Sequence, residues 1–213
     1  PNTVHQADLL FLPHDKVRRK TYKYALTVVD VASRYKEAEP LTDKSASSVA
    51  DAFKIIYNRG PLKWPHFLQV DPGREFFGSV SELFRKNNVR IRRGIVALHR
   101  QQAIVERFNR TLAERLFGHQ YYKEITEGGR CREWVKRLPD VIHALNNEKT
   151  KMIGKKPADV IKSKLVLQQN KITSLQPLLS ADTLVRYLYE PGELEGGNTR
   201  RATDPIWSVT VHN

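Results

Sequence analysis

Cysteine is almost absent from this chain of 213 residues, in which Cys131 is the only one. A single thiol excludes an internal disulfide framework, and it excludes the zinc sites that need several cysteine ligands. Stability must therefore come from the burial of apolar side chains. We expect a protein of a reducing compartment.

Long apolar runs are also missing. No stretch of about 18 consecutive apolar residues occurs, and no apolar core of a signal peptide follows Pro1. No amphipathic helix of the membrane-surface type is evident either. Because the chain also opens without Met, we expect a soluble intracellular fragment that has no membrane partner.

Acidic residues are too few to balance the basic ones. The chain has 36 Lys and Arg residues against 23 Asp and Glu residues, which gives a net charge of +13 and a pI near 9.9. This excess predicts a polyanionic partner, and nucleic acid is the better candidate where no membrane-binding helix exists. The alternative is that the charge only aids solubility.

Apolar periodicity predicts an alternation of strands and helices along the first three quarters of the chain. Strands are expected at about residues 4–12, 22–31, 35–40, 66–70 and 89–93, with a polar break from Pro13 to Lys20. Helices are expected at about residues 47–58, 79–87, 100–119 and 131–146. A kink or break is expected at Pro139, because proline inside a helix costs about 3 kcal/mol. The order predicts an α/β fold with a mixed five-stranded sheet and helices on both faces.

Three acids stand out against this pattern. Asp8 lies inside the apolar run from Ala7 to Leu12, where an unpaired carboxylate is costly. Asp71 ends a predicted strand, and 34 residues separate it from Glu106 in a predicted helix. Each acid alone has an ordinary explanation, as a polar strand residue with a partner, a turn residue or a solvated helix residue. Together they predict a metal site.

The segments around these acids resemble the catalytic core of retroviral integrases, which belongs to the RNase H-like superfamily of polynucleotidyl transferases. The similar segments occur in the family's order and at about its distances: Gln6–Leu9, Tyr24–Tyr35, Asp71–Phe76 and Ile104–Leu112. The last of these is most similar to integrases of Maverick/Polinton-type transposons and Ty3/gypsy-type retroelements. The resemblance implies an RNase H-like sheet.

By this resemblance, Asp8, Asp71 and Glu106 are both the catalytic acids and the metal ligands. Asp8 would bridge two Mg²⁺ ions, Asp71 would bind one of them and Glu106 the other, and Mn²⁺ would substitute. Carboxylate oxygens suit such hard cations, and two ions suit the transfer of a phosphoryl group. A fourth acid, Asp30, is expected to hydrogen-bond nearby backbone in a turn and to have no catalytic role.

Two features depart from the family pattern. The spacing between Asp71 and Glu106 is one residue shorter than usual, which predicts a shortened loop after His99. Pro72 stands where many relatives have Asn or Arg. Neither is expected to disable the site.

DNA contacts are expected from basic side chains near the acids, where guanidinium groups would meet phosphates. The candidates on the predicted helix and strand are Arg100, Arg107, Arg110, Arg92 and Arg93. Asn109 is expected to hold the helix against the strands of the site. The basic run from Lys16 to Lys20 would either contact DNA or form an ordinary hairpin turn, and it resembles a nuclear-localisation patch.

Three regions are expected along the chain: the integrase core at residues 1–163, a linker at 164–180, and the opening of an SH3-like barrel at 181–213. Strands are expected in the last region at residues 183–189 and 204–211. Roughly 30 residues are too few for an independent barrel. We therefore expect the barrel to be cut short after Asn213 or to lean on the core.

The predicted function is that of a nuclear, metal-dependent DNA integrase with endonuclease activity. It would trim the 3′ ends of element DNA and join them to target DNA, so double-stranded DNA is the expected partner. A homo-oligomer is implied because two DNA ends must be joined together. Two alternatives remain: an RNase H-like nuclease, and a domesticated, non-catalytic DNA-binding protein.

Overall fold

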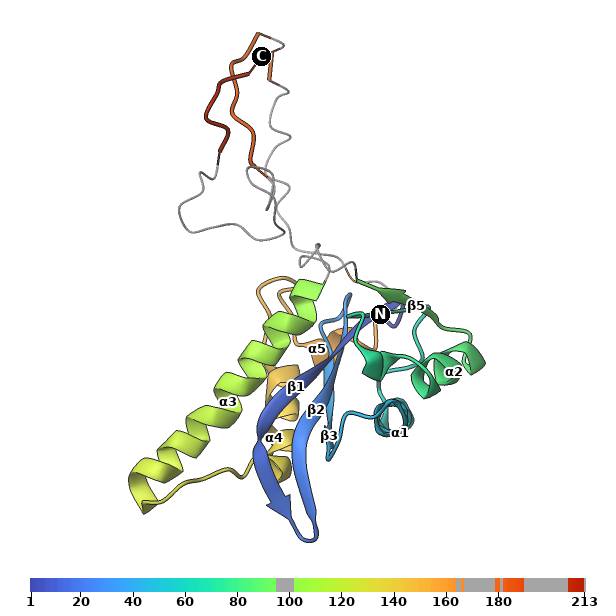
Figure 1. The fold of residues 1–213 in the computed structure, drawn as a ribbon, viewed down its shortest axis with the longest axis vertical. Coiled ribbons are helices and arrows are strands. Elements are labelled where there is room, and N and C mark those ends of the chain that lie inside the picture. Colours follow the sequence, from blue (N-terminus) through green and yellow to red (C-terminus); the bar gives the residue numbers. More distant parts are fainter. Residues whose placement is uncertain (95–101, 164–165, 167–178, 181, 190–206, 213) are drawn as a thin grey trace. The chain divides into compact units, whose positions relative to one another are not determined.

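The computed structural model describes residues 1–94, 102–163, 166, 179–180, 182–189 and 207–212 (Figure 1). The chain divides into two compact units, Pro1–Gln169 and Asn170–Asn213. No helix within the described ranges has the length and apolar content needed to cross a membrane. The first unit contains the sheet and all the named helices.

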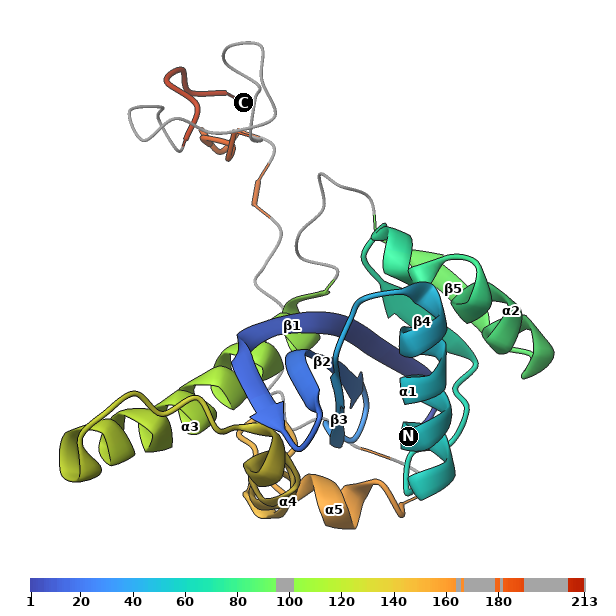
Figure 2. The same cartoon turned by 60° about the horizontal axis from the view of Figure 1, so that its bottom comes forward.

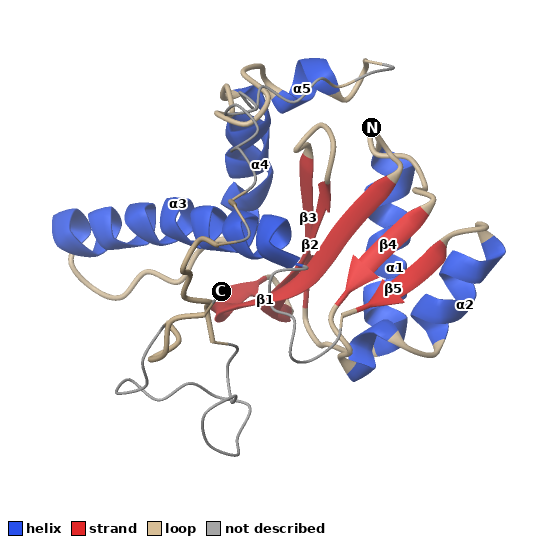
Figure 3. Ribbon diagram, turned by 90° about the horizontal axis from the view of Figure 1, so that it is seen from above, coloured by secondary structure: helices blue, strands red, loops and turns tan. Residues whose placement is uncertain are grey.

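The first unit is built on a five-stranded mixed sheet (Figure 3). Its strands are β1 (Val4–Val17), β2 (Lys20–Asp30), β3 (Lys36–Leu41), β4 (Phe67–Val70) and β5 (Arg90–Arg93). Their spatial order is β3-β2-β1-β4-β5, antiparallel across β1, β2 and β3 and parallel across β1, β4 and β5. The mixed sheet predicted from the sequence is confirmed.

Helices cover both faces of this sheet (Figure 2). One face carries α1 (Ala46–Arg59) and α2 (Ser79–Lys86), and the other carries α3 (Ala103–Glu127) and α4 (Leu138–Asn147). Short helical turns complete the unit: η1 (Arg74–Phe76), η3 (Val135–Arg137) and α5 (Pro157–Val160). The three-layer arrangement follows from strands that are apolar on both sides.

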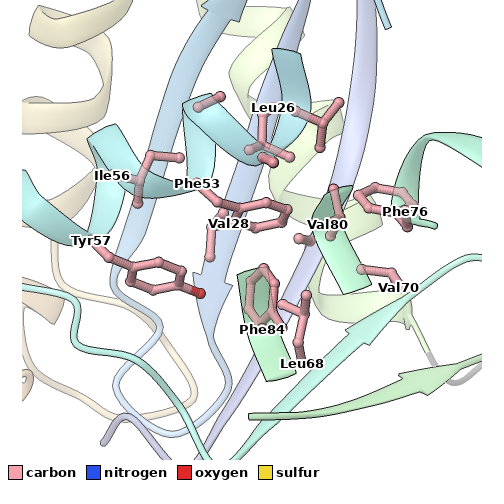
Figure 4. Packing of buried hydrophobic residues seen from close by; sticks show 14 of the residues in the cluster. Leu26, Val28, Phe53, Ile56, Tyr57, Leu68, Val70, Phe76, Val80 and Phe84 are labelled. Carbon is pink, nitrogen blue, oxygen red and sulfur yellow. The ribbon is translucent and has the colours of Figure 1, made fainter. Parts of the chain in front are cut away.

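The strand alternation separates two apolar cores. Ala7 and Leu9 of β1 belong to the core under α1 and α2, whereas Leu12 belongs to the core under α3 and α4. Figure 4 shows Phe53 and Phe84 of the first core packed near Val28. Because successive side chains of a strand point to opposite faces, Asp8 lies on the α3 side of the sheet.

The expected polar break from Pro13 to Lys20 is wrong. Strand β1 continues to Val17, and its register against β2 shifts between Phe11 and Asp15. Proline has no N–H to donate to a ladder, so a bulge accommodates Pro13 while pairing resumes beyond it. The first two strands therefore form a longer hairpin than apolar patterning predicts.

The helix boundaries differ from the prediction in two places, the end of α3 and the start of α4, which lies at Leu138 instead of about residue 131. Helix α3 continues past residue 119 to Glu127 and ends at Gly128, whose φ of 68° suits a residue without a side chain. The break expected at Pro139 is confirmed, because α4 begins at Leu138 and Pro139 occupies its first turn. Proline is tolerated there since a first-turn N–H has no partner within the helix.

The second unit contains little regular structure among its described residues. Two isolated bridges pair Val185 with His212 and Leu188 with Trp207. The SH3-like opening stays a prediction, because residues 190–206 and most of the expected linker lie outside the described residues.

Candidate active site

Asp8 is held on the α3 side of β1 by two hydrogen bonds. The Leu9 backbone N–H donates to Asp8 Oδ1 at 2.7 Å, and Asn109 Nδ2 of α3 donates to Asp8 Oδ2 at 2.7 Å. Asn109 Oδ1 in turn accepts from Thr27 Oγ1 of β2 at 2.7 Å. Asn109 thus fastens α3 to the two central strands, and the role predicted for it is confirmed.

Gln6 fixes the beginning of α3. Its Oε1 accepts from the Val105 backbone N–H at 3.1 Å, and its Nε2 donates to Gln69 Oε1 of β4 at 3.0 Å. The first N–H groups of a helix lack partners within it, so this side chain completes the first turn of α3. Sequence reasoning missed Gln6, although its position two residues before Asp8 places it on the same face of β1.

Asp71 and Glu106 approach Asp8 from two other elements. Gln6 pairs with Gln69 across the parallel strands β1 and β4, and this register places Asp8 level with Asp71. Glu106 lies exposed in the first turn of α3, where the helix dipole favours a negative charge. The fold therefore directs three acids that are distant in sequence towards one region.

The pKa of Asp8 is raised to about 6. Burial is the largest cause because it disfavours the charged carboxylate, and the negative charges of Asp71, Glu106 and Glu75 add to it, while the Leu9 hydrogen bond opposes them. None of the ion pairs among the described residues involves Asp8, Asp71 or Glu106. The region therefore holds negative charge that no described cation neutralises.

Divalent cations fit the chemistry of this donor set, since hard ions prefer carboxylate oxygens. The side chains stand apart, however. No group of three or more His, Cys, Asp or Glu residues in the described part of the chain is placed to hold an ion. Carboxylates without a cation between them repel one another, so convergence requires the ion or a side-chain movement.

Glu75 is a fourth acid near the site, and sequence reasoning did not single it out. Its carboxyl group folds back over Gly73, where a side chain would meet Glu75 atoms at 2.6 to 2.7 Å. Its negative charge contributes to the raised pKa of Asp8. The signal was present, because Glu75 lies in the same integrase-like segment as Asp71.

Asp30 has the structural role predicted for it. Its carboxylate accepts from the Ser33 backbone N–H at 2.7 Å and from the Asn2 backbone N–H at 2.7 Å. Burial acts to raise its pKa, but hydrogen bonds from His5 and Ser33 outweigh burial and lower the pKa to about 2. Asp30 thus shapes the turn after β2.

The arginines predicted to contact DNA differ in their exposure and in their contacts. Arg107 and Arg110 are exposed on α3, and Arg110 Nε donates to the exposed Glu114 at 3.1 Å. Arg92 is exposed on β5, with its guanidinium 4.0 Å from the Phe67 ring centroid. Arg100 lies outside the described residues.

Arg93 is engaged within the fold. It donates to the Phe76 carbonyl at 3.0 Å and to Ser81 Oγ at 2.8 Å, and it lies 4.1 Å from the Phe77 ring centroid. These contacts tie β5 to η1 and α2, so Arg93 supports the segment that follows Asp71.

The raised pKa of Asp8 predicts a pH dependence of stability in the metal-free protein. Because the folded state binds this proton more tightly than the unfolded chain, stability should fall as pH rises from about 4 to about 6. Relative to Asp8→Asn, which does not titrate, the parent protein should lose roughly 1–3 kcal/mol of unfolding free energy over this range. Urea unfolding with a chelator at several pH values measures it. Equal pH slopes for both proteins would contradict the raised pKa.

Comparison with known sequences relates the chain to integrases. Residues 1–97 match the family described as the integrase core domain. The chain is 33% identical over 138 residues to a putative uncharacterized transposon-derived protein of Caenorhabditis elegans, covering 64% of this chain and 45% of that protein. It is 28% identical over 167 residues to the Gag-Pol polyprotein of walleye dermal sarcoma virus, covering 78% of this chain and 9% of the polyprotein. The chain thus spans less than half of either relative.

Solved structures share the fold at low sequence identity. A chain of a simian T-cell lymphotropic virus intasome in complex with the PP2A regulatory subunit B56 gamma matches with a TM-score of 0.65 and 16% identity, over 98% of this chain and 67% of that chain. The catalytic core domain of BIV integrase gives 0.58 and 20%, over 76% and 94%. The HTLV-2 integrase catalytic core in complex with magnesium, in a trimeric form, gives 0.56 and 17%, over 75% and 96%.

Proposed function

Because residues 1–97 match the integrase core domain of retroviruses and transposons, we propose that this protein is a metal-dependent DNA integrase. It would trim the 3′ ends of element DNA and join them to target DNA. The observation that carries the proposal is a set of three acids without ion-pair partners among the described residues: Asp8 lies level with Asp71, and the charges of Asp71 and Glu106 contribute to the raised pKa of Asp8.

The roles of the residues follow from their positions. Asp8, Asp71 and Glu106 would hold Mg²⁺ or Mn²⁺, which when bound supply activation of the attacking oxygen and stabilisation of the leaving oxygen. Asn109 orients Asp8 through the hydrogen bond at 2.7 Å. Gln6 anchors the first turn of α3, which carries Glu106. The related HTLV-2 core in complex with magnesium supports the choice of ion.

The exposed arginines would bind the DNA backbone. Arg92 is exposed on β5, and Arg107 and Arg110 are exposed on α3; charge-assisted hydrogen bonds to phosphate position DNA without reading its sequence. We propose double-stranded DNA, as element ends and as target, and a homo-oligomer as the working form. The intasome and the trimeric core among the similar structures support this assembly. We also propose a nuclear location, because DNA is the proposed substrate.

A branched duplex tests the proposal, because an enzyme that joins a 3′ end to target DNA also catalyses the reverse step. The full chain is incubated with a duplex carrying such a junction in Mg²⁺, and the products are separated on a denaturing gel. An integrase yields a resealed target strand and a released end. Cleaved strands without resealing indicate a nuclease, and a shifted band without any new product indicates a non-catalytic DNA-binding protein.

Binding to DNA should depend strongly on salt. With a net charge of +13, affinity for an unrelated duplex should fall about a hundredfold or more between about 50 and 200 mM salt, because bound phosphates release counterions. Fluorescence anisotropy with a labelled duplex at several salt concentrations measures this. A flat response would mean that the basic surface does not bind phosphate.

A further inference from the structure

A pocket of about 460 Å³ lies beside α3, and Arg107 is the residue of its lining that is also a proposed DNA contact. Its walls come from the start of α3, from β2 and β3 near the turn that joins them, and from the end of α4 with the segment after it. The apolar part of its lining consists of Val29, Ala103, Ile104, Phe108, Leu145 and Met152. A preformed apolar hollow of this size suits a small ligand or an inserted side chain.

Basic side chains surround this hollow. Arg34, Lys36, Arg107, Lys149 and Lys151 all line it. Glu148 is the acid in the lining, and its carboxylate accepts from Arg115 Nη2 at 3.0 Å. Within the described part of the chain, none of the five basic side chains forms an ion pair. We call these five residues the basic rim.

The pKa values of two rim cations are lowered in part by neighbouring rim cations. The pKa of Lys36 is lowered to about 8, first by burial and then by the positive charge of Arg34, although Glu148 opposes the change. Burial also lowers the pKa of Arg34, with Arg107 adding to it and Asp30 opposing. Because like charges repel, cations held close together without an anion raise the free energy of the unliganded protein. An anion at the rim would relieve this repulsion.

A hydrogen-bond donor in the same lining also lacks a partner. Thr150 Oγ1 is buried and forms no hydrogen bond with any described residue. A buried polar group without a partner costs free energy unless a ligand or a water satisfies it. The pocket therefore offers an apolar floor and a basic rim, and the buried Thr150 hydroxyl lies in its wall.

We propose that this pocket binds an acidic peptide segment of a partner protein, in which an apolar side chain is flanked by carboxylates. The apolar side chain would fill the hollow, and the carboxylates would pair with the basic rim. A DNA backbone would satisfy the cations, but a paired duplex projects no apolar group into a hollow. Charge and lining together therefore favour the peptide.

Peptide binding to the full chain tests this site. The probe is a fluorescein-labelled peptide, Asp-Glu-Leu-Phe-Glu-Asp, and its partner control carries Ser-Ser in place of Leu-Phe. The first peptide should bind measurably and the second at least about tenfold more weakly, since the apolar pair supplies the contact with the floor. Fluorescence polarisation reads both affinities.

A pair of charge reversals locates the site. Lys149→Glu with Lys151→Glu should weaken binding of the acidic peptide about tenfold or more, because two rim cations are reversed. The matched control is Lys155→Glu with Lys156→Glu, which makes the same charge change at exposed positions that do not line the pocket. That control should bind the peptide within about twofold of the parent. All four lysines are exposed, and melting temperatures verify that both variants fold.

Three outcomes would overturn the proposal. The serine peptide would bind as tightly as the apolar one, or the control variant would lose as much affinity as the rim variant, or the rim variant would lose affinity for duplex DNA while keeping it for the peptide. The last outcome would assign the rim to nucleic acid. None of these readouts depends on integration activity, so the proposal stands or falls separately from the proposed function.

Discussion

Glu106→Gln should reduce both 3′-end trimming and strand joining by several orders of magnitude. The substitution keeps the side-chain volume and the helix but removes one of the charges that the metal ions require. Both reactions would use the same ions to stabilise charge in the transition state, so both should fall together. Trimming is measured on blunt-ended duplexes and joining on duplexes with recessed 3′ ends, in Mg²⁺ and in Mn²⁺.

Folding and DNA binding should survive this substitution. The negative charge of Glu106 contributes to the raised pKa of Asp8, so its removal relieves repulsion in the metal-free protein. The melting temperature without metal should be unchanged or slightly higher. DNA affinity should persist, because Arg and Lys side chains supply it.

Glu127→Gln is the matched control, since Glu127 is exposed at the other end of the same helix. It should retain parental activity. If Glu106→Gln remains active at a similar level, Glu106 is not a metal ligand, and the shortened spacing before it becomes the first place to look for the reason.

Asp15→Ala should lower the free energy of unfolding by about 2–4 kcal/mol, the largest stability effect that we expect from a single polar side chain. Asp15 is 5% exposed, and its Oδ2 accepts from the backbone N–H groups of Trp134 and Val135, both at 2.8 Å. Alanine leaves these two N–H groups without their acceptor. Urea unfolding at neutral pH measures the loss.

Two further variants give this prediction its controls. Asp15→Asn keeps one acceptor oxygen and should cost less than Asp15→Ala. Asp51→Ala removes an exposed acid that pairs with exposed Lys54 at 2.9 Å, and such surface pairs contribute about 1 kcal/mol or less. A loss for Asp15→Ala no larger than that for Asp51→Ala would show that Asp15 does not anchor the segment before α4.

The sequence identified some residues of the candidate site and missed others. Asp8 and Asp71 could be identified from the sequence, because each interrupts or ends a local apolar pattern in a segment that resembles the family. Arg93 is a basic residue of the kind that contacts DNA, yet in the fold it donates hydrogen bonds to the Phe76 carbonyl and to Ser81 Oγ. Gln6 carried no local signal of its contact with Val105, since the two residues are 99 positions apart.

The sequence by itself determined the order of the strands and helices along the chain, the position of Asp8 inside an apolar strand, and the break at Pro139. These features depend on neighbours within a few residues, through the periods of strand and helix and the missing N–H of proline. Only the tertiary structure decided that β1 continues past Pro13, that Asp15 holds Trp134, and that Arg34, Lys36 and Lys149 surround one hollow. The extension of β1 rests on backbone pairing with β2, which apolar patterning does not record. The other two features join residues more than a hundred positions apart, and chain closure over such distances leaves no pattern in local sequence.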